Sequence, residues 1–367
     1  MAAGYDKAAP SLLHSANSQW GIHRLQLLSL LPVSIAALFN VGYQYLTVLA
    51  NTPGAEPDDL RGYIADVLGA SHQDPGLFDL LTAGLAHMVP ILLVALLTGG
   101  VWERIIADKR RRPFEPGFIL IALLFTLLLP GAAPFSHVVF GMSFAILVGK
   151  GIFGGEGKTF LSPALLGIAI VQISFPSAAN LHPLWNGLAG YAGSDVIALY
   201  HRGGEAALAS ADINLWSAFI GSTPGQIGTT SVLAVALGAV LLLFTRIIAW
   251  RLLLAQIIGL VVTAALFNAL GPESGASAMP GYWHLLLGSF AFGAVYLACD
   301  PVASSCTNPG RWIQGFFIGA LVVLIRVANP THPDAVIPVI LLASILAPLI
   351  DYAVIAVNIR QRARRHV

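Results

Sequence analysis

Three carboxylates lie within or at the ends of long apolar runs, where an ionised side chain is costly. Glu103 and Asp300 each follow the end of such a run, and Asp351 lies inside the last run of the chain. Asp351 precedes Arg360 by about two and a half helical turns, so a surface position is least expected for this residue. Acidic side chains at membrane depth are typical of cation or proton paths. We therefore predict that these three acids line an ion path.

Two of the acids also have a structural interpretation. Glu103 could be an interfacial partner of Arg104 or of the basic cluster 109–112. Asp300 is followed by Pro301 and could cap a following turn. The sequence leaves both alternatives open.

Two glycine-rich segments could bring a ligand close to the backbone. Gly99 and Gly100 open a helix flank on which a flat ligand could lie, although close helix packing also explains them. Segment 154–158 offers consecutive amides that could cradle an anion, but it lacks the spacing of a P-loop. It predicts either a ligand loop or a re-entrant turn. We find no nucleophile elbow, metal-ligand pair or dinucleotide fingerprint, and we predict no catalytic or metal-binding residues.

The composition is that of an integral membrane protein. Hydrophobic residues make up 56% of the 367 residues, charged residues make up 10%, and the mean hydropathy is +0.77. Soluble domains usually contain about 25% charged residues. Most of the apolar runs approach the ~20 residues that a helix needs to cross a bilayer, and two are marginal. The runs are 27–50, 80–101, 117–131 (marginal), 136–153, 161–176 (marginal), 230–249, 252–270, 282–299, 313–328 and 335–357. We therefore predict an all-α protein with ten transmembrane helices.

The distribution of lysine and arginine orients these helices. With the N-terminus in the cytoplasm, every Lys and Arg except Arg61, Arg202 and Arg326 falls on the inner side. An even number of spans then places the C-terminus inside as well. The predicted parts are a cytoplasmic segment 1–26, a membrane domain 27–358 with outer loops 51–79 and 177–229, and a basic cytoplasmic tail 359–367.

Ten spans divide into two sets of five that begin on opposite sides, as an inverted repeat requires. Two segments rich in Gly, Ser and Pro support this hypothesis: 151–163 and 300–310 follow the fourth and eighth spans on the inner side. Irregular backbone at membrane depth survives only when it is buried in protein or lines a cavity. These two segments together predict the binding centre.

Seven stretches of the chain resemble a known family, the B subunit of sodium-translocating NADH:quinone oxidoreductases (Nqr) and, more loosely, the D subunit of Rnf complexes. The resemblance runs from about residue 24 to the end. Its most specific stretches are 99–103, 153–164, 224–231, 283–293, 300–304, 324–330 and 347–351. It implies a ten-helix subunit of a redox-driven ion pump that carries flavin and contributes to quinone reduction and sodium passage.

The resemblance also assigns roles to single residues. Gly99 and Gly100 resemble the quinone-associated glycine pair of the family. Glu103 and Asp351 are similar to acids tied to cation uptake, and Asp300 to the acid of an Asp-Pro-Val motif. These are the three carboxylates that the bilayer argument selects.

The chain departs from the family at the flavin positions. The family attaches FMN by a phosphoester to the threonine of a Ser-Gly-Ala-Thr motif, and Asp195 stands at that position. A carboxylate cannot form this ester, so covalent FMN is not expected. Thr159 and Ser162 replace two riboflavin-associated asparagines, and both keep a hydrogen-bonding hydroxyl. The two replacements weaken the case for a non-covalent flavin, riboflavin or FMN, but leave it open. Its predicted site consists of Gly154, Gly155, Lys158, Thr159, Ser162 and Pro163.

The resulting prediction is a membrane subunit of an Nqr/Rnf-type complex that couples quinone-linked or ferredoxin/NADH-linked electron transfer to cation translocation in the bacterial inner membrane. The chain has no nucleotide-binding domain and no cluster-binding cysteine set, so electrons must come from partner subunits that carry flavin and iron–sulfur centres. Quinone is the expected substrate, and no nucleic acid partner is expected. The alternative is a non-redox transporter or channel for a small solute or ion on the same scaffold.

Overall fold

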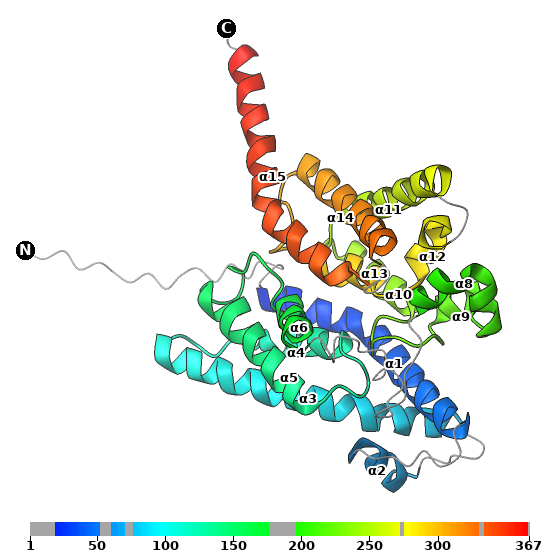
Figure 1. The fold of residues 1–367 in the computed structure, drawn as a ribbon. Helices are drawn as coiled ribbons and strands as arrows, with labels where there is room; N and C mark the ends of the chain where they lie inside the picture. The colour runs from blue at the N-terminus through cyan, green and yellow to red at the C-terminus, as the bar shows by residue number, and fades with distance from the viewer. Residues whose placement is uncertain are drawn as a thin grey trace, which may run out of the picture.

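The protein is built from helices of very different lengths (Figure 1). In this computed structural model the described residues are 19–51, 60–69, 76–175, 196–271, 275–329 and 334–365. Within these ranges there is no β-strand. The predicted all-α class is therefore confirmed for the part of the chain that the structure describes.

Six helical stretches among the described residues are long and apolar enough to cross a bilayer. They are α1 (Gln19–Asn51), α3 (Leu77–Arg110), α5 (Phe135–Phe144) with its continuation η1 (Ala145–Ile152), α11 (Trp250–Leu270), α14 (Asn308–Ala328) and α15 (Val336–Arg365). Their length and composition support a membrane protein.

The other predicted spans lie on shorter or broken helices. The shorter apolar helices are α4 (Phe118–Leu127), α6 (Pro163–Ser174) and α10 (Val232–Phe244). The run 282–299 is divided among α12 (Gly281–Leu286), α13 (Phe290–Phe292) and η4 (Gly293–Leu297). Every predicted run thus lies on helical structure, while the number of ten spans and the inverted repeat stay predictions.

Several helices extend beyond the predicted apolar runs. α1 begins at Gln19, inside the segment 1–26, and α15 continues through the basic tail to Arg365. Hydropathy marks only the stretch that suits lipid, whereas Gln, Ala and Arg continue a helix readily in water. The two predicted outer loops also contain helix: α2 (Leu60–Val67) in the first, and α8 (Val196–Ser210) and α9 (Leu215–Ile220) in the second.

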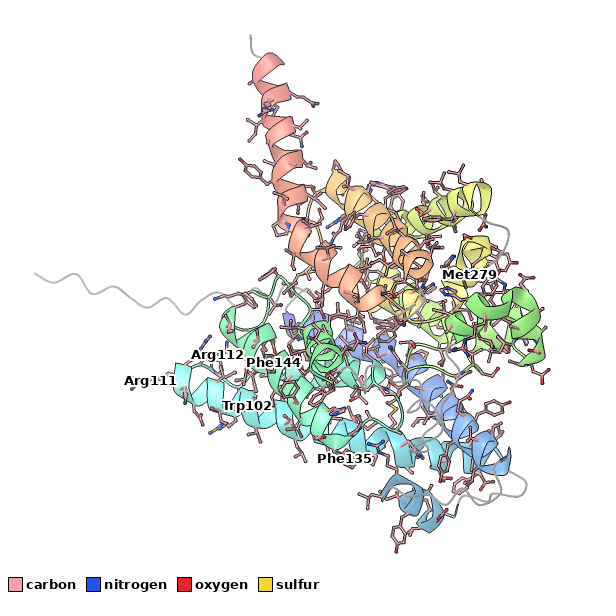
Figure 2. The ribbon with its side chains drawn as sticks, viewed as in Figure 1. Trp102, Arg111, Arg112, Phe135, Phe144 and Met279 are labelled. Atoms are coloured by element: carbon pink, nitrogen blue, oxygen red, sulfur yellow. The ribbon has the colours of Figure 1, made fainter. Side chains whose placement is uncertain are left out.

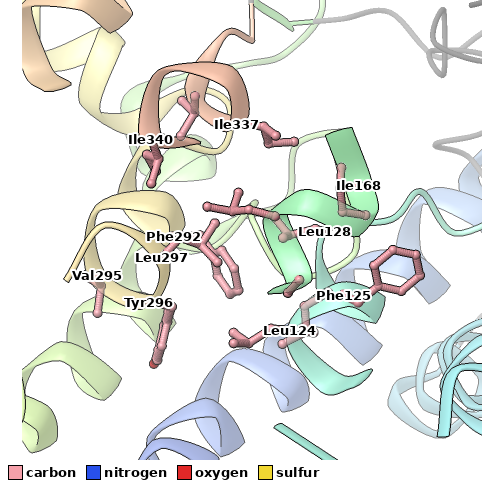
Figure 3. Close-up of a cluster of buried hydrophobic side chains, with 14 of the residues drawn as sticks. Leu124, Phe125, Leu128, Ile168, Phe292, Val295, Tyr296, Leu297, Ile337 and Ile340 are labelled. Atoms are coloured by element: carbon pink, nitrogen blue, oxygen red, sulfur yellow. The ribbon is translucent and has the colours of Figure 1, made fainter. Parts of the chain in front are cut away.

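The helices form two groups that share one buried core. The first group consists of α3, α4, α5 and α6, which pack on one another, and the second of α11, α14 and α15. Between the groups, α1 contacts α10, and α6 contacts α15. Leu124 and Leu128 belong to this core together with Phe292, Ile337 and Ile340 (Figure 3). Because lipid is as apolar as leucine, such a core holds helices together by close packing and not by excluding water.

Glycines allow the closest helix pair, α11 with α14. A Cβ on Gly319 would lie 2.0 Å from the carbonyl oxygen of Gln256, and one on Gly259 would lie 2.4 Å from that of Phe316. Small residues at such contacts let two backbones approach in a membrane.

Two π-helical segments end the runs that lead into the irregular backbone. η1 precedes segment 153–162, and η4 lies just before segment 298–307. A π-helical turn holds an extra residue and is frequent at functional sites. On the other side of the molecule, α8, α9 and α12 pack around Met279, which Figure 2 shows far from Arg112.

Candidate functional site

Glu103 is bound to a buried lysine at the end of α5–η1. The ammonium nitrogen of Lys150 lies 2.9 Å from Glu103 Oε2, 3.1 Å from Glu156 Oε1 and 3.2 Å from Glu115 Oε2. The side chains of Lys150 and Glu103 are 1% and 0% exposed. A buried ion is tolerated when opposite charges surround it, so these four residues form one electrostatic unit, the Lys150 cluster.

Arg112 joins the Lys150 cluster from the connection after α3. Its Nη2 lies 3.6 Å from Glu103 Oε1, and its Nη1 lies 3.7 Å from Glu115 Oε1. Arg104 instead pairs with Asp108 at 3.2 Å on the exposed surface. Glu103 is therefore paired with Arg112, a member of the basic cluster that the sequence offered as a partner, and not with Arg104.

Hydrogen bonds tie the connection 112–117 to the glycine-rich segment 154–158. The amide of Gly117 donates to Glu156 Oε1 at 2.6 Å, the amide of Glu156 donates to Glu115 Oε2 at 3.1 Å, and Arg112 Nη1 donates to the Gly154 carbonyl at 2.9 Å. Burial alone would raise the pKa of Glu115, but the Glu156 amide and the charges of Lys150 and Arg112 outweigh it and lower that pKa.

Gly155 is required where this segment turns. Its φ is +115°, and a Cβ there would lie 2.2 Å from Arg112 Nη1. Only glycine adopts this conformation without strain. The glycine-rich segment is therefore a turn bound to arginine, and its amides do not form the open anion cradle that the sequence also allows.

A narrow cavity lies beside the Lys150 cluster. It is bounded by α1, by α4 and by both irregular segments, so the structure brings the two segments of the predicted binding centre together. Its volume is about 70 Å³, and we call this narrow cavity the slot. The polar residues that line it are His23, Gln26, Lys150, Glu156, Thr159, Ser162, Tyr296 and Asp300.

Some predicted ligand residues reach this cavity and others do not. Thr159 and Ser162 line it, are 8% and 4% exposed, and make no side-chain hydrogen bond to any other described residue. Pro163 lines it as well. Gly154, Gly155 and Lys158 are not among the lining residues, and Lys158 is exposed. The two buried hydroxyls are free to bind a ligand.

Asp300 caps a turn and also lines the cavity. Its Oδ1 accepts a hydrogen bond from the amide of Val302 at 3.0 Å, as expected of a residue that caps a turn. It also lines the cavity opposite α4, together with Val302. Asp300 is therefore the one predicted ion-path acid that faces the cavity.

Asp351 binds the far end of the same irregular segment. Its Oδ1 accepts from the Ser305 hydroxyl at 2.5 Å and from the Thr307 amide at 3.0 Å, and its Oδ2 accepts from the Cys306 amide at 2.7 Å. The Thr307 hydroxyl also donates to it. Because these groups lie at the N-terminus of α14, the carboxylate is placed at the positive end of a helix dipole.

The contacts of Gly99 and Gly100 are those of helix packing. A Cβ on Gly99 would lie 2.6 Å from the Met142 methyl group, and one on Gly100 would lie 3.5 Å from the Phe118 ring. Trp102 Nε1, on the same helix and labelled in Figure 2, donates to the α5 hydroxyl of Ser143 at 2.9 Å. A quinone role for the pair stays a prediction. Asp195 lies outside the described residues.

Sequence reasoning missed Lys150, Glu115 and His23 as parts of the site. It included Arg112 only within a cluster of possible partners for Glu103, and Glu156 only within the segment 154–158. One signal was available, because Lys150 falls inside the apolar run 136–153, where a lone cation needs a carboxylate partner. The identity of those partners depends on contacts between residues about 40 positions apart, such as Arg112 with Gly154. No local pattern carries that information.

The fold and the cavity define a class: a helical membrane protein with a small, charged cavity between two irregular segments. Comparison with known proteins gives the family. The chain belongs to the NQR2, RnfD, RnfE family, whose model matches residues 7–360. The resemblance inferred from the sequence is thereby confirmed.

Three relatives carry the same name, each as the B subunit of a Na(+)-translocating NADH-quinone reductase. The protein of Azotobacter vinelandii is 39% identical over 339 residues, which are 92% of this chain and 84% of the relative. That of Chromohalobacter salexigens is 38% identical over 335 residues, 91% of this chain and 81% of the relative. That of Pseudomonas aeruginosa is 38% identical over 338 residues, 91% and 84% respectively.

Proposed function

We propose that this chain is the membrane subunit of an Nqr/Rnf-type complex, in which electron transfer drives a cation across the bacterial inner membrane. Family membership and the names of the relatives support the proposal. The observation that carries it is the buried Lys150 cluster beside a polar slot, because membrane proteins keep such charges where ions or electrons move. The proposal includes ten spans in two inverted halves and both termini in the cytoplasm.

In the proposed ion path, the three acids Glu103, Asp300 and Asp351 each have a different role. Asp300 faces the slot, Glu103 acts through Lys150, and Asp351 holds the segment on which Asp300 lies. In reconstituted vesicles, Asp300→Asn should abolish sodium uptake coupled to electron transfer. Unchanged uptake would remove Asp300 from the path.

The slot is the proposed site of a non-covalent flavin. Thr159 and Ser162 offer unpaired hydroxyls among the described residues, and Leu120, Ile121 and Leu124 give one apolar wall, so the lining suits a flat ring with polar edges. A bound flavin supplies one- and two-electron transfer. The lining residues would position the ring, donate hydrogen bonds to it and exclude lipid.

Flavin analysis of the purified complex tests this site. Acid denaturation should release flavin from the wild-type chain, and Thr159→Val with Ser162→Ala should lower the amount bound. A fluorescent flavin that stays on this chain in a denaturing gel would instead show a covalent link and refute the interpretation of Asp195.

We propose that other subunits of the complex supply the redox centres that this chain lacks. Other membrane and peripheral subunits that carry flavin and iron–sulfur centres would deliver electrons, and quinone would be reduced near Gly99 and Gly100. Purification from the native membrane should recover such subunits together with this chain. A chain that purifies without redox partners would favour the non-redox transporter.

A further inference from the structure

His23 reaches the slot from α1 and has an unused ring nitrogen. Its Nδ1 is buried and has no hydrogen-bond partner among the described residues, and it lies 3.7 Å from Glu156 Oε2. The ring packs closely on Gly117, where a Cβ would come 3.0 Å from its Cε1 atom. The ring is therefore held in place, while its Nδ1 makes no hydrogen bond to another described residue.

Three other titratable groups that line the slot already have partners. Lys150 is paired with three carboxylates, Glu156 accepts from Lys150 and from the Gly117 amide, and the Tyr296 hydroxyl donates to the Ser29 carbonyl at 2.7 Å. Asp300, which is proposed above for the cation, accepts from the Val302 amide. Among the described residues of the slot, His23 is the titratable group whose buried ring nitrogen has no hydrogen-bond partner.

Charged groups surround His23 on several sides. Glu156 lies next to it with Lys150 behind at 3.1 Å from that carboxylate, and Asp300 faces it within the slot. Its neighbour Arg24 turns away and lies over the Trp20 ring at 4.9 Å.

We propose that His23 is the proton donor and acceptor for the ligand of this slot. The inference rests on the proposed function, because it needs a flavin there. If a one-electron carrier of a partner subunit reduced a bound flavin, the protonated imidazole would give a ring proton to a flavin nitrogen, and neutral His23 would regain a proton from water. Oxidation would run the same transfers in reverse.

The test follows reduction of the bound flavin in the purified complex by dithionite between pH 5.5 and 8.5. The absorbance phase that belongs to this slot is the one lost in the Thr159→Val, Ser162→Ala variant. In the wild type its rate should fall through one inflection as pH rises. His23→Gln should keep the flavin content, lose the inflection and slow the low-pH rate about 100-fold, the usual size of a general acid's contribution.

Two further variants separate a proton role from a structural one. His137→Gln makes the same substitution on α5, where the ring stacks on Phe175 at 4.1 Å, and should leave the rate and the inflection unchanged. His23→Ala should be rescued by added imidazole, which a lost packing contact would not be.

Each result decides something definite. A wild-type complex with no flavin phase assigned to the slot overturns both the flavin site and this proposal. A normal flavin phase that keeps its rate and inflection in His23→Gln overturns the role of His23 alone. Loss of flavin from His23→Gln together with failure of imidazole to rescue His23→Ala assigns His23 to binding and refutes proton transfer.

Discussion

Replacing Lys150 by Met should destabilise the protein more than any other single lysine change among the described residues. The substitution keeps most of the volume and removes a charge that three carboxylates approach within 3.2 Å. Among the described residues, Glu103, which is fully buried, would retain only Arg112 at 3.6 Å as a cationic partner. Breaking a buried ion pair from one side costs about 3–5 kcal/mol.

The size of the effect follows from how each acid is exposed. Glu115 and Glu156 are 25% and 12% exposed and can recover some hydration, so most of the cost falls on Glu103. We expect a loss of about 3–5 kcal/mol, which is at least a hundredfold in the folding equilibrium because each 1.4 kcal/mol is about tenfold. A denaturant titration and a thermal scan of the solubilised protein with its partners measure it.

Lys158 provides the matched control. It lies on the same segment but is exposed, so Lys158→Met should stay within about 0.5 kcal/mol of the wild type. Adding Glu103→Gln to Lys150→Met should recover part of the loss, because it removes the stranded charge. The reasoning is refuted if Lys150→Met is as stable as Lys158→Met, or if the double variant is simply the sum of two losses.

Three other perturbations have definite outcomes. Gly155→Ala must adopt a positive φ and displace Arg112, so the thermal midpoint should fall by an amount that corresponds to about 1–3 kcal/mol, and an unchanged midpoint would contradict the described turn. Asp351→Asn should cost about 1–3 kcal/mol, because an amide accepts the hydrogen bonds before α14 poorly, and limited proteolysis should then cut that turn. Hydrogen bonds from Trp283, and then from Tyr282, lower the pKa of Glu205 in the folded state. The stability that Glu205 contributes is therefore fully present above its ordinary, unfolded-state pKa of 4.5. It is lost as the pH falls through the lower pKa of the folded state. Tryptophan fluorescence during acid titration should show this loss in the wild type and not in Glu205→Gln.

The helices were predictable because lipid imposes a simple composition on them. Each apolar run lies on helix, and Asp300 lines the slot beside the irregular backbone that the Gly, Ser and Pro content predicts. The ends of α1 and α15 were not predictable from hydropathy, since a helix continues in water after its apolar stretch ends.

The partners of the site residues could not be derived from local pattern. The hydrogen bonds of Asp351 reach residues 44 to 46 positions away, and those between Arg112 and Gly154 span 42 positions. Such pairings depend on how helices pack, which hydropathy does not encode. The same limit explains why the sequence suggested Arg104 or the cluster 109–112 as partners of Glu103, and not Lys150.

Lys150 lies within the π-helical segment η1. A π-helical turn holds one residue more than an α-helical turn, and successive residues of an α-helix differ in direction by about 100°. Deleting Gly149 with a return to ordinary winding should therefore leave Lys150 directed at Glu103, because the lost residue and the lost π-helical turn offset each other. The segment thus gives this helix a place where its length can change by one residue while the buried charge pair is kept.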